Sequence, residues 1–284
     1  AAQERGLRVT GSELIGLIPL KAMLDAADFY LLKQERSLGI CESEKIKIAV
    51  KSLGLDDLKS FHPNEKIIEY VLKGKTNNLI DMSLTAFADE TAGESMAPGG
   101  GSISAYVGAL GVSLGTMVAN LSAHKPGWDN RWSEFSDWAV KGQSYKETLM
   151  ALVDEDTHAF NKIIDAFRLP KSSLEEKSIH SQAVELATKY GTEIPFKVME
   201  TACNSMEVML AMVKDGLQNS LSDAGVGALC ARTAVTGAYF NVRINAKDIK
   251  DRTYAEALLK KAASVYKDAL QKEAEIIAFI DAKI

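Results

Sequence analysis

An acidic run inside an apolar helical pattern contains the first residue whose type and position could do chemistry. Apolar residues recur at helical spacing through 133–167, and Asp154 and Asp156 fall within this segment. With about 100° of rotation per residue, Asp156 lies near the middle of the apolar stripe, one turn from Leu152 and from Phe160. Asp154 falls on the opposite face. The spacing therefore predicts that Asp156 points toward the protein core.

A carboxylate held away from water must be paired, hydrogen-bonded, or protonated with a raised pKa. A carboxyl group whose pKa is raised can act as a general acid and base near neutral pH. The alternative is a structural acid, satisfied by a helix N-terminus or by an arginine such as Arg232. The helical pattern leaves both interpretations open for Asp156.

A glycine-rich segment at 97–102, with the sequence APGGGS, precedes a long apolar helix predicted over 103–121. Pro98 ends the preceding element, and Ser102 is predicted to cap the new helix. A glycine loop that opens a helix can bind an anion, because unpaired N–H groups and the positive end of the helix dipole face the ligand. A purely structural turn is the other interpretation, since the segment matches neither GxGxxG nor the Walker pattern.

A second polar group lies in the C-terminal third of the chain. Asn241 and Asn245 are four residues apart, which places them on one face of a helix, near Tyr239. The stretch around Asp223 has a simpler interpretation, because Asn219 or Ser220 just before it is suited to be an N-cap.

Composition excludes several classes of function. The 284 residues carry 33 basic and 38 acidic side chains, for a net charge of −5, which argues against a protein that binds nucleic acid or a membrane surface. The three cysteines, Cys41, Cys203 and Cys230, are far apart and form no metal-ligand motif, so no metal is expected. No uninterrupted apolar run reaches the length of a membrane span and no signal peptide is evident, which favours a cytoplasmic protein.

The order of predicted elements indicates a mainly α protein, a helical bundle with a small α+β N-terminal part. Residues 7–18 are predicted to be extended and to end at Pro19. The predicted helices are 20–33, 43–53, 65–72, 79–90, 103–121, 133–167, 172–189, 193–214, 221–242 and 253–282. Long helices with short connections are typical of a bundle. We expect 1–72 and 79–284 to be separate domains joined by a linker at 73–78.

Four motifs in the second domain, taken in order, resemble the cyclodeaminase domain of formimidoyltransferase-cyclodeaminase. They are APGGGS at 97–102, LVDED at 152–156 followed by AF at 159–160, LSD at 221–223, and GAYFNVRIN at 237–245. The resemblance extends from about residue 79 to the end. Residues 5–21 and 67–70 are similar to the last part of the transferase domain and the lead into its linker. The transferase histidine is expected upstream of residue 1, so the chain itself is not expected to transfer the formimidoyl group.

The resemblance implies an all-helical folate enzyme of histidine breakdown and one-carbon metabolism. It would close 5-formimidoyltetrahydrofolate to 5,10-methenyltetrahydrofolate and release ammonia, with Asp156 as the proton donor and acceptor. The same domain also resembles stand-alone methenyltetrahydrofolate cyclohydrolases, which use water at the same carbon. A third hypothesis, from another class, is a non-catalytic folate-binding or assembly module.

The resemblance also suggests where the substrate would lie. The predicted substrate-binding residues are Pro98, Gly99, Gly100, Gly101, Ser102, Asp223, Tyr239, Asn241, Arg243 and Asn245. The glutamate tail of the folate is expected near Lys125, Arg131 or Arg243, with Trp128 or Trp132 offering a stacking surface. Beyond the folate substrate, no tightly bound cofactor is expected. The partners expected are the missing transferase portion and further copies of the chain, in a homodimer or a higher homo-oligomer.

Overall fold

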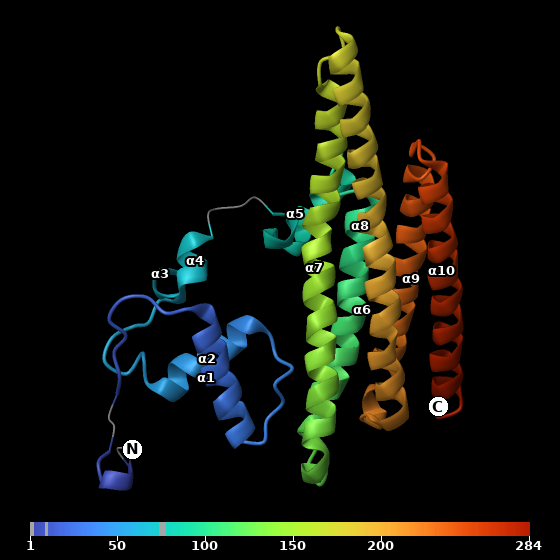
Figure 1. The fold of residues 1–284 in the computed structure, drawn as a ribbon. Helices are drawn as coiled ribbons and strands as arrows, with labels where there is room; N and C mark the ends of the chain where they lie inside the picture. The colour runs from blue at the N-terminus through green and yellow to red at the C-terminus, as the bar shows by residue number, and fades with distance from the viewer. Residues whose placement is uncertain (1–2, 9–10, 74–77) are drawn as a thin grey trace.

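Five long helices dominate the computed structural model, which describes residues 3–8, 11–73 and 78–284 (Figure 1). They are α6 (Gly100–Ala123), α7 (Trp132–Arg168), α8 (Leu174–Asp215), α9 (Leu221–Asn245) and α10 (Arg252–Asp281). The shorter helices among the described residues are α1 (Leu20–Lys33), α2 (Glu42–Leu53), α3 (Pro63–Lys66), α4 (Ile68–Leu72) and α5 (Leu84–Ala92), with 3₁₀ turns at Gln3–Arg5, Leu79–Asp81, Asp129–Arg131 and Gln218–Ser220. The predicted mainly α bundle is confirmed.

Helix α6 lies at the centre of the bundle, packed against α7, α8 and α9, while α10 covers α8 and α9. Its small residues allow this close packing: a Cβ atom on Gly111 would lie 2.7 Å from the carbonyl oxygen of Gly227 in α9. By length and composition α6 is the one helix of the described chain that could cross a membrane, but most of it is buried inside the bundle. Burial among other helices is typical of the core helix of a soluble protein.

The N-terminal helices have a small core of their own, centred on Met23, Ala27, Ile46 and Ile67. The expected α+β character of this part is wrong for the residues that the structure describes. Residues 11–17 form no strand, and the only β feature is an isolated parallel bridge between Ile18 and Ile67. Strand pairing needs a partner of matching length, and here the partner residue sits between two short helices. Residues 9–10 of the predicted strand and 74–77 of the predicted linker lie outside the described residues.

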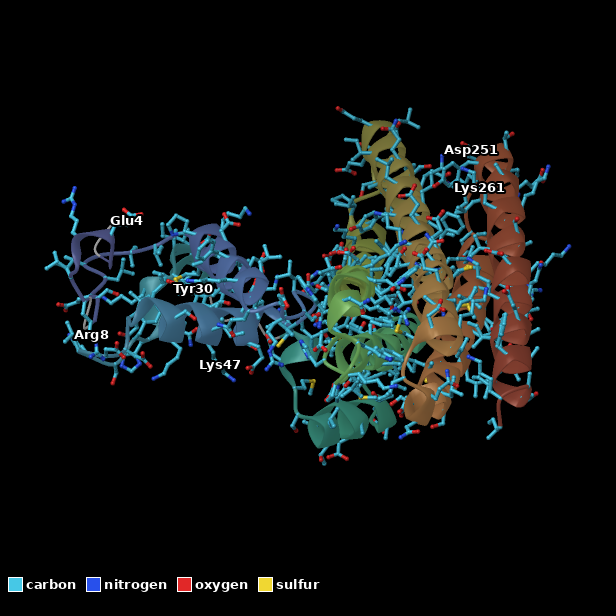
Figure 2. The ribbon with its side chains drawn as sticks, turned by 90° about the horizontal axis from the view of Figure 1, so that it is seen from below. Glu4, Arg8, Tyr30, Lys47, Asp251 and Lys261 are labelled. Atoms are coloured by element: carbon cyan, nitrogen blue, oxygen red, sulfur yellow. The ribbon has the colours of Figure 1, made fainter. Side chains whose placement is uncertain are left out.

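The loop between α1 and α2 attaches this small core to the bundle. The carbonyl oxygen of Gly39 accepts hydrogen bonds from Asn120 of α6 at 2.8 Å and from Gln143 of α7 at 3.1 Å. A Cβ on Gly39 would come within 2.2 Å of the Cβ of Ala139, so only glycine fits this approach. Figure 2 shows the result: the helices carrying Tyr30 and Lys47 lie on one side of the bundle, and α10, marked by Asp251 and Lys261, on the other.

Most predicted helix boundaries are confirmed to within a few residues, but several are wrong. The helix predicted over 65–72 is divided at Ile67 into α3 and α4, and the one predicted over 79–90 becomes α-helical only from Leu84. The predicted break near Gly191 is wrong, because α8 runs unbroken from Leu174 to Asp215. Gly191 is buried in the helix interior, where a Cβ would lie 2.7 Å from the Cδ1 of Ile163, so the glycine serves close packing against α7. Ser102 is also not the N-cap of α6, which begins two residues earlier after Gly99.

Candidate active site

The N-terminus of α6 is satisfied by a carboxylate from α7. No side chain of its own cap makes a hydrogen bond, and instead the backbone N–H of Ser102 donates to Oδ2 of Asp156 at 2.9 Å. An anion at this position interacts favourably with the positive end of the helix dipole. The helix N-terminus considered in the sequence as a partner for Asp156 is therefore present, whereas Arg232 forms its ion pair with Glu273.

The side chain of Ser102 contributes less to holding this carboxyl than its backbone does. Its hydroxyl lies 3.2 Å from Oδ2 of Asp156, but also 2.8 Å from the carbonyl oxygen of Val153. A hydroxyl has one hydrogen to donate, and the shorter contact is to Val153. The main donor to Asp156 is thus the backbone N–H, which cannot rotate away.

Gly101 makes the approach of the two helices possible. A Cβ at this position would lie 2.1 Å from Oδ1 of Asp156 and 2.4 Å from its Cγ. These distances are far inside van der Waals contact, and the clash involves backbone on one side. Any larger residue at 101 would displace the carboxyl group.

Burial raises the pKa of Asp156 above its ordinary value, and the hydrogen bonds from Ser102 offset part of this effect. The charged form loses its hydration, and one firm donor does not replace the several water molecules that a carboxylate binds in solution. No arginine or lysine forms an ion pair with it among the residues that the structure describes. Asp156 therefore has the property that the sequence suggested for an acid and base near neutral pH.

The carboxyl group borders a cavity of about 280 Å³ between α6, α7, α8 and α9. Its lining residues are Met96, Ala97, Gly99, Gly100, Gly101, Asp156, Thr157, Phe160, Ile163, Gly191, Asn241 and Asn245. One wall is thus the glycine segment. The others combine the apolar side chains of Phe160 and Ile163 with polar ones from α7 and α9. A cavity that brings a few polar groups together is the usual form of a small-molecule site.

Two predicted residues of α9, Asn241 and Asn245, line this cavity, and the side-chain nitrogen of each donates to a backbone carbonyl. Asn241 donates from Nδ2 to the carbonyl oxygen of Gly237 at 2.9 Å, and Asn245 donates to that of Gly191 at 2.8 Å. Their carbonyl oxygens make no hydrogen bond among the residues described, so each can accept one from a ligand. The structure brings them together with Gly99, Gly100, Gly101 and Asp156.

The remaining predicted residues lie outside the cavity lining. Pro98 is buried behind the loop, Ser102 reaches the site only through Asp156, and Tyr239 stacks on Tyr266 of α10 at 5.0 Å between ring centroids. Arg243 lies over the ring of Tyr239. None of these four side chains belongs to the cavity wall.

Three of the predicted residues, Asp223, Lys125 and Arg131, are far from Asp156 because the lengths of α9 and α6 separate them from it. Asp223 is in the first turn of α9, 18 residues before Asn241, which corresponds to about 27 Å. Lys125 lies over the ring of Trp128 beyond the last turn of α6, about 36 Å from its start, and Arg131 lies over Trp128 as well. Within one chain, none of them can line this cavity.

The neighbours of Asp156 on α7 have structural partners. Asp154 accepts a hydrogen bond from the backbone N–H of Leu79 at 2.6 Å, and Glu155 accepts one from the hydroxyl of Tyr190. Nδ1 of His158 lies 3.6 Å from Oε2 of the same Glu155. Of the three acids in the run, Asp156 is the one that borders the cavity.

Six lining residues were not among the predicted site residues: Met96, Ala97, Thr157, Phe160, Ile163 and Gly191. Gly191 had a signal, because a glycine within a helical pattern often marks a close approach, but it was interpreted as a break. Thr157 follows Asp156 directly, and nothing in its local pattern distinguishes it.

The fold and site together define a mainly helical protein. In it, one desolvated carboxyl group binds the N-terminus of a helix and borders a cavity of small-molecule size. The chain belongs to the formiminotransferase-cyclodeaminase family. The family model described as "Formiminotransferase-cyclodeaminase" matches residues 83–264, and the model described as "Formiminotransferase domain" matches residues 1–73. The resemblance found in the sequence motifs is confirmed.

Known relatives agree with this membership. The chain is 37% identical over 284 residues to formimidoyltransferase-cyclodeaminase of Rattus norvegicus and covers 52% of that protein, so it spans about half the length of the curated relatives it matches first. It is 29% identical over 202 residues to methenyltetrahydrofolate cyclohydrolase of Methylorubrum extorquens, covering 71% of this chain and 97% of that one. The fold is similar to the crystal structure of formiminotetrahydrofolate cyclodeaminase from Thermotoga maritima, with a TM-score of 0.63 at 24% identity over 71% of this chain and 96% of that one.

Proposed function

We propose that the chain catalyses the cyclodeaminase reaction, in which 5-formimidoyltetrahydrofolate closes to 5,10-methenyltetrahydrofolate and ammonia leaves. The observation that carries the proposal is the carboxyl group of Asp156, buried so that its pKa is raised, at the edge of a cavity in a chain of this family. The assignment by resemblance and the helical stripe lead to this same residue.

The reaction requires two proton transfers at neighbouring atoms. N10 of the folate attacks the carbon of the formimidoyl group in its protonated, amidinium form, and the C=N electron pair moves to the nitrogen. A C–N bond forms, the carbon becomes tetrahedral and bears an amino group, and the N10 proton passes to the carboxylate of Asp156. The protonated carboxyl then returns the proton to the amino nitrogen, the C–N bond to that nitrogen breaks, and ammonia departs. One group can serve both steps when its pKa lies closer to neutrality than that of an ordinary aspartate.

The surrounding residues have positioning roles in this mechanism. The backbone N–H of Ser102 fixes Oδ2 of Asp156, which leaves Oδ1, beside Gly101, as the oxygen nearer the glycine wall of the cavity. The carbonyl oxygens of Asn241 and Asn245 would accept hydrogen bonds from the N–H groups of the pterin. Phe160 and Ile163 would pack against its flat face and exclude water.

The test is the appearance of the methenyltetrahydrofolate absorbance when protein is added to 5-formimidoyltetrahydrofolate. We expect Asp156→Asn to lower kcat by about 10²- to 10⁴-fold, the usual contribution of general acid–base catalysis. Asp165→Asn is the matched control, because it makes the same change on the same helix at an exposed side chain, and its rate should equal that of the wild type. Folate binding with no turnover by the wild type would support the non-catalytic module instead.

The Methylorubrum extorquens relative supports a second candidate, a methenyltetrahydrofolate cyclohydrolase. In that reaction water adds to the same carbon and the ring opens, so one carboxyl at the same place would again move the protons. Incubating the protein with 5,10-methenyltetrahydrofolate, without ammonia, distinguishes the two. Faster loss of absorbance here than gain with the formimidoyl substrate would favour the cyclohydrolase.

We further propose a cytoplasmic homodimer in which 1–72 and 79–284 are separate domains. Support for the dimer comes from the neighbouring helices α6 and α9, which carry large apolar side chains that are exposed in the single chain. These are Leu110, Met117, Leu121, Val226 and Leu229. Light scattering after size-exclusion chromatography measures the mass directly. A monomeric mass at micromolar concentration would contradict this part of the proposal.

A further inference from the structure

A second cavity, of about 330 Å³, adjoins the one that contains Asp156. The two have Ile163 and Asn245 in common, so a ligand in the first can continue past these side chains into the second. The second cavity lies where the end of α7, the start of α8 and the turn between α9 and α10 meet. In Figure 1 this is the region where α7 and α8 extend beyond α6.

One part of this cavity is aromatic and holds an unpaired nitrogen. The ring of His180 lies edge-on to that of Phe167, with 6.4 Å between centroids. The Nε2 atom of His180 is buried and has no hydrogen-bond partner among the described residues. A buried polar atom without a partner is costly, and a ligand that supplies one recovers that cost.

Another part of the cavity carries an ammonium group. Nζ of Lys250 donates to the hydroxyl of Ser181 at 2.7 Å, and within the described part of the chain it forms no close ion pair. The carboxylate of Glu185 interacts with its charge from a longer distance. Asp248 also lines the cavity and opposes the positive charge. The second cavity thus offers a ring-binding wall, an unpaired nitrogen and an ammonium group.

We infer that this second cavity binds the p-aminobenzoylglutamate part of the folate whose pterin occupies the Asp156 cavity. The benzoyl ring packs against Phe167, His180 hydrogen-bonds to the amide that follows it, and a glutamate carboxylate meets Lys250. This inference rests on the proposed function, because it assigns the other half of the same substrate. It replaces the expected contacts with Lys125 and Arg131, which lie at the opposite end of α6.

The test compares two ligands that share the benzoyl amide and differ in the glutamate: 5-formyltetrahydrofolate and the primary amide of 5-formyltetrahydropteroic acid. Their dissociation constants are measured by fluorescence with the full chain. The wild type should bind the glutamate-bearing ligand more tightly. Lys250→Met, which keeps the aliphatic stem, should weaken that ligand by about tenfold, the value of one exposed charge-assisted hydrogen bond, and leave the other unchanged.

The matched control is Lys247→Met, three residues earlier on the same turn, whose side chain is exposed and does not line the cavity. It should bind both ligands as the wild type does. Asp248→Asn should tighten the glutamate-bearing ligand, because it removes the opposing charge. His180→Ala should weaken both ligands, since both contain the benzoyl group.

Equal affinities of the wild type and Lys250→Met for 5-formyltetrahydrofolate would overturn this inference and leave the proposed function intact. An equal loss for both ligands would overturn it as well, because it would indicate a general disturbance. A wild type that binds neither ligand would instead overturn the proposed function on which the inference rests.

Discussion

The two ends of α6 use the same kinds of residue for different purposes. At the first end, Gly101 allows α7 to bring in a carboxyl group, and the result is a desolvated acid beside a cavity. At the last end, the buried hydroxyl of Ser122 donates to Val118 and accepts from the N–H of Leu217, so this hydroxyl is fully paired. Burial lowers the pKa of His124 there, and its Nε2 accepts a hydrogen bond from the N–H of Ser37. The comparison teaches that small residues pack both ends, but only the first end places a desolvated acid beside a cavity lined by glycines.

A pair of glycine variants would test this difference most strongly. Gly101→Ala places a Cβ 2.1 Å from Asp156, whereas Gly142→Ala places one 2.1 Å from Oγ1 of Thr116, nearer the last end of α6. Overpacking of this kind costs about 1–3 kcal/mol of stability in either case, partly offset by the better helix propensity of alanine. We expect kcat/KM to fall at least about tenfold in Gly101→Ala only.

Urea unfolding monitored by circular dichroism gives the stability of both variants, and the methenyltetrahydrofolate absorbance gives their activity. Two variants with equal loss of stability and equal loss of activity would show that the ends are not functionally distinct.

The attachment of the N-terminal helices near the last end of α6 is the next target. Gly39→Ala should push the loop away from Ala139, at a cost of about 2 kcal/mol confined to the docking contact. Amide hydrogen exchange should then increase in 34–41, while α6 to α10 keep their protection. Faster exchange in the bundle as well would mean that the two cores unfold together.

Ser122→Ala tests the pairing at the last end directly. It leaves the buried N–H of Leu217 without its acceptor, which we expect to lower the free energy of unfolding by about 1–2 kcal/mol without changing kcat. Ser122→Thr keeps the hydroxyl and serves as the comparison. Equal stability of the alanine variant and the wild type would show that water replaces the hydroxyl.

The smallest expected effect is a pH dependence of stability at the first end. The folded protein binds a proton at Asp156 more tightly than the unfolded chain does, because burial raises the pKa. Stability contributed by this group therefore falls as pH rises from the ordinary Asp value of 3.8 through the raised value, and then stays lower.

Asp156→Asn cannot ionise, so its Tm should exceed that of the wild type at pH 7 and lose this advantage below about pH 4. Thermal unfolding across this range measures the difference. A lower Tm than the wild type at pH 7 would show that the charged carboxylate stabilises α6 by more than its desolvation costs.

Much of the bundle could be predicted from sequence because long amphipathic helices carry their own periodicity and end signals. Asp156 could be found for the same reason, since a charged residue in an apolar stripe is conspicuous. The hydrogen bond that holds Asp156 could not be predicted in the same way. Ser102 was expected to cap its own helix, whereas its backbone N–H donates to Asp156 of α7, 54 residues later. Local patterns do not contain that information.

Features that depend on contacts between distant segments escaped prediction. The docking role of Gly39 requires knowing that α7 lies beside it, and the cavity next to Lys250 forms only when three separate chain segments meet. Lys125 and Arg131 were expected near the ligand for their charge alone, but the length of α6 separates them from it.

The carboxyl group of Asp156 has two roles. Besides the proposed proton transfer, it accepts the hydrogen bond that an N-cap side chain of α6 would otherwise accept. A descendant that abandoned the reaction would still need an oxygen acceptor at this position to begin its central helix, and asparagine would suffice. An acceptor side chain at this position therefore does not by itself indicate activity. An active relative also needs a second carboxylate oxygen, as Oδ1 is here, and asparagine does not supply one.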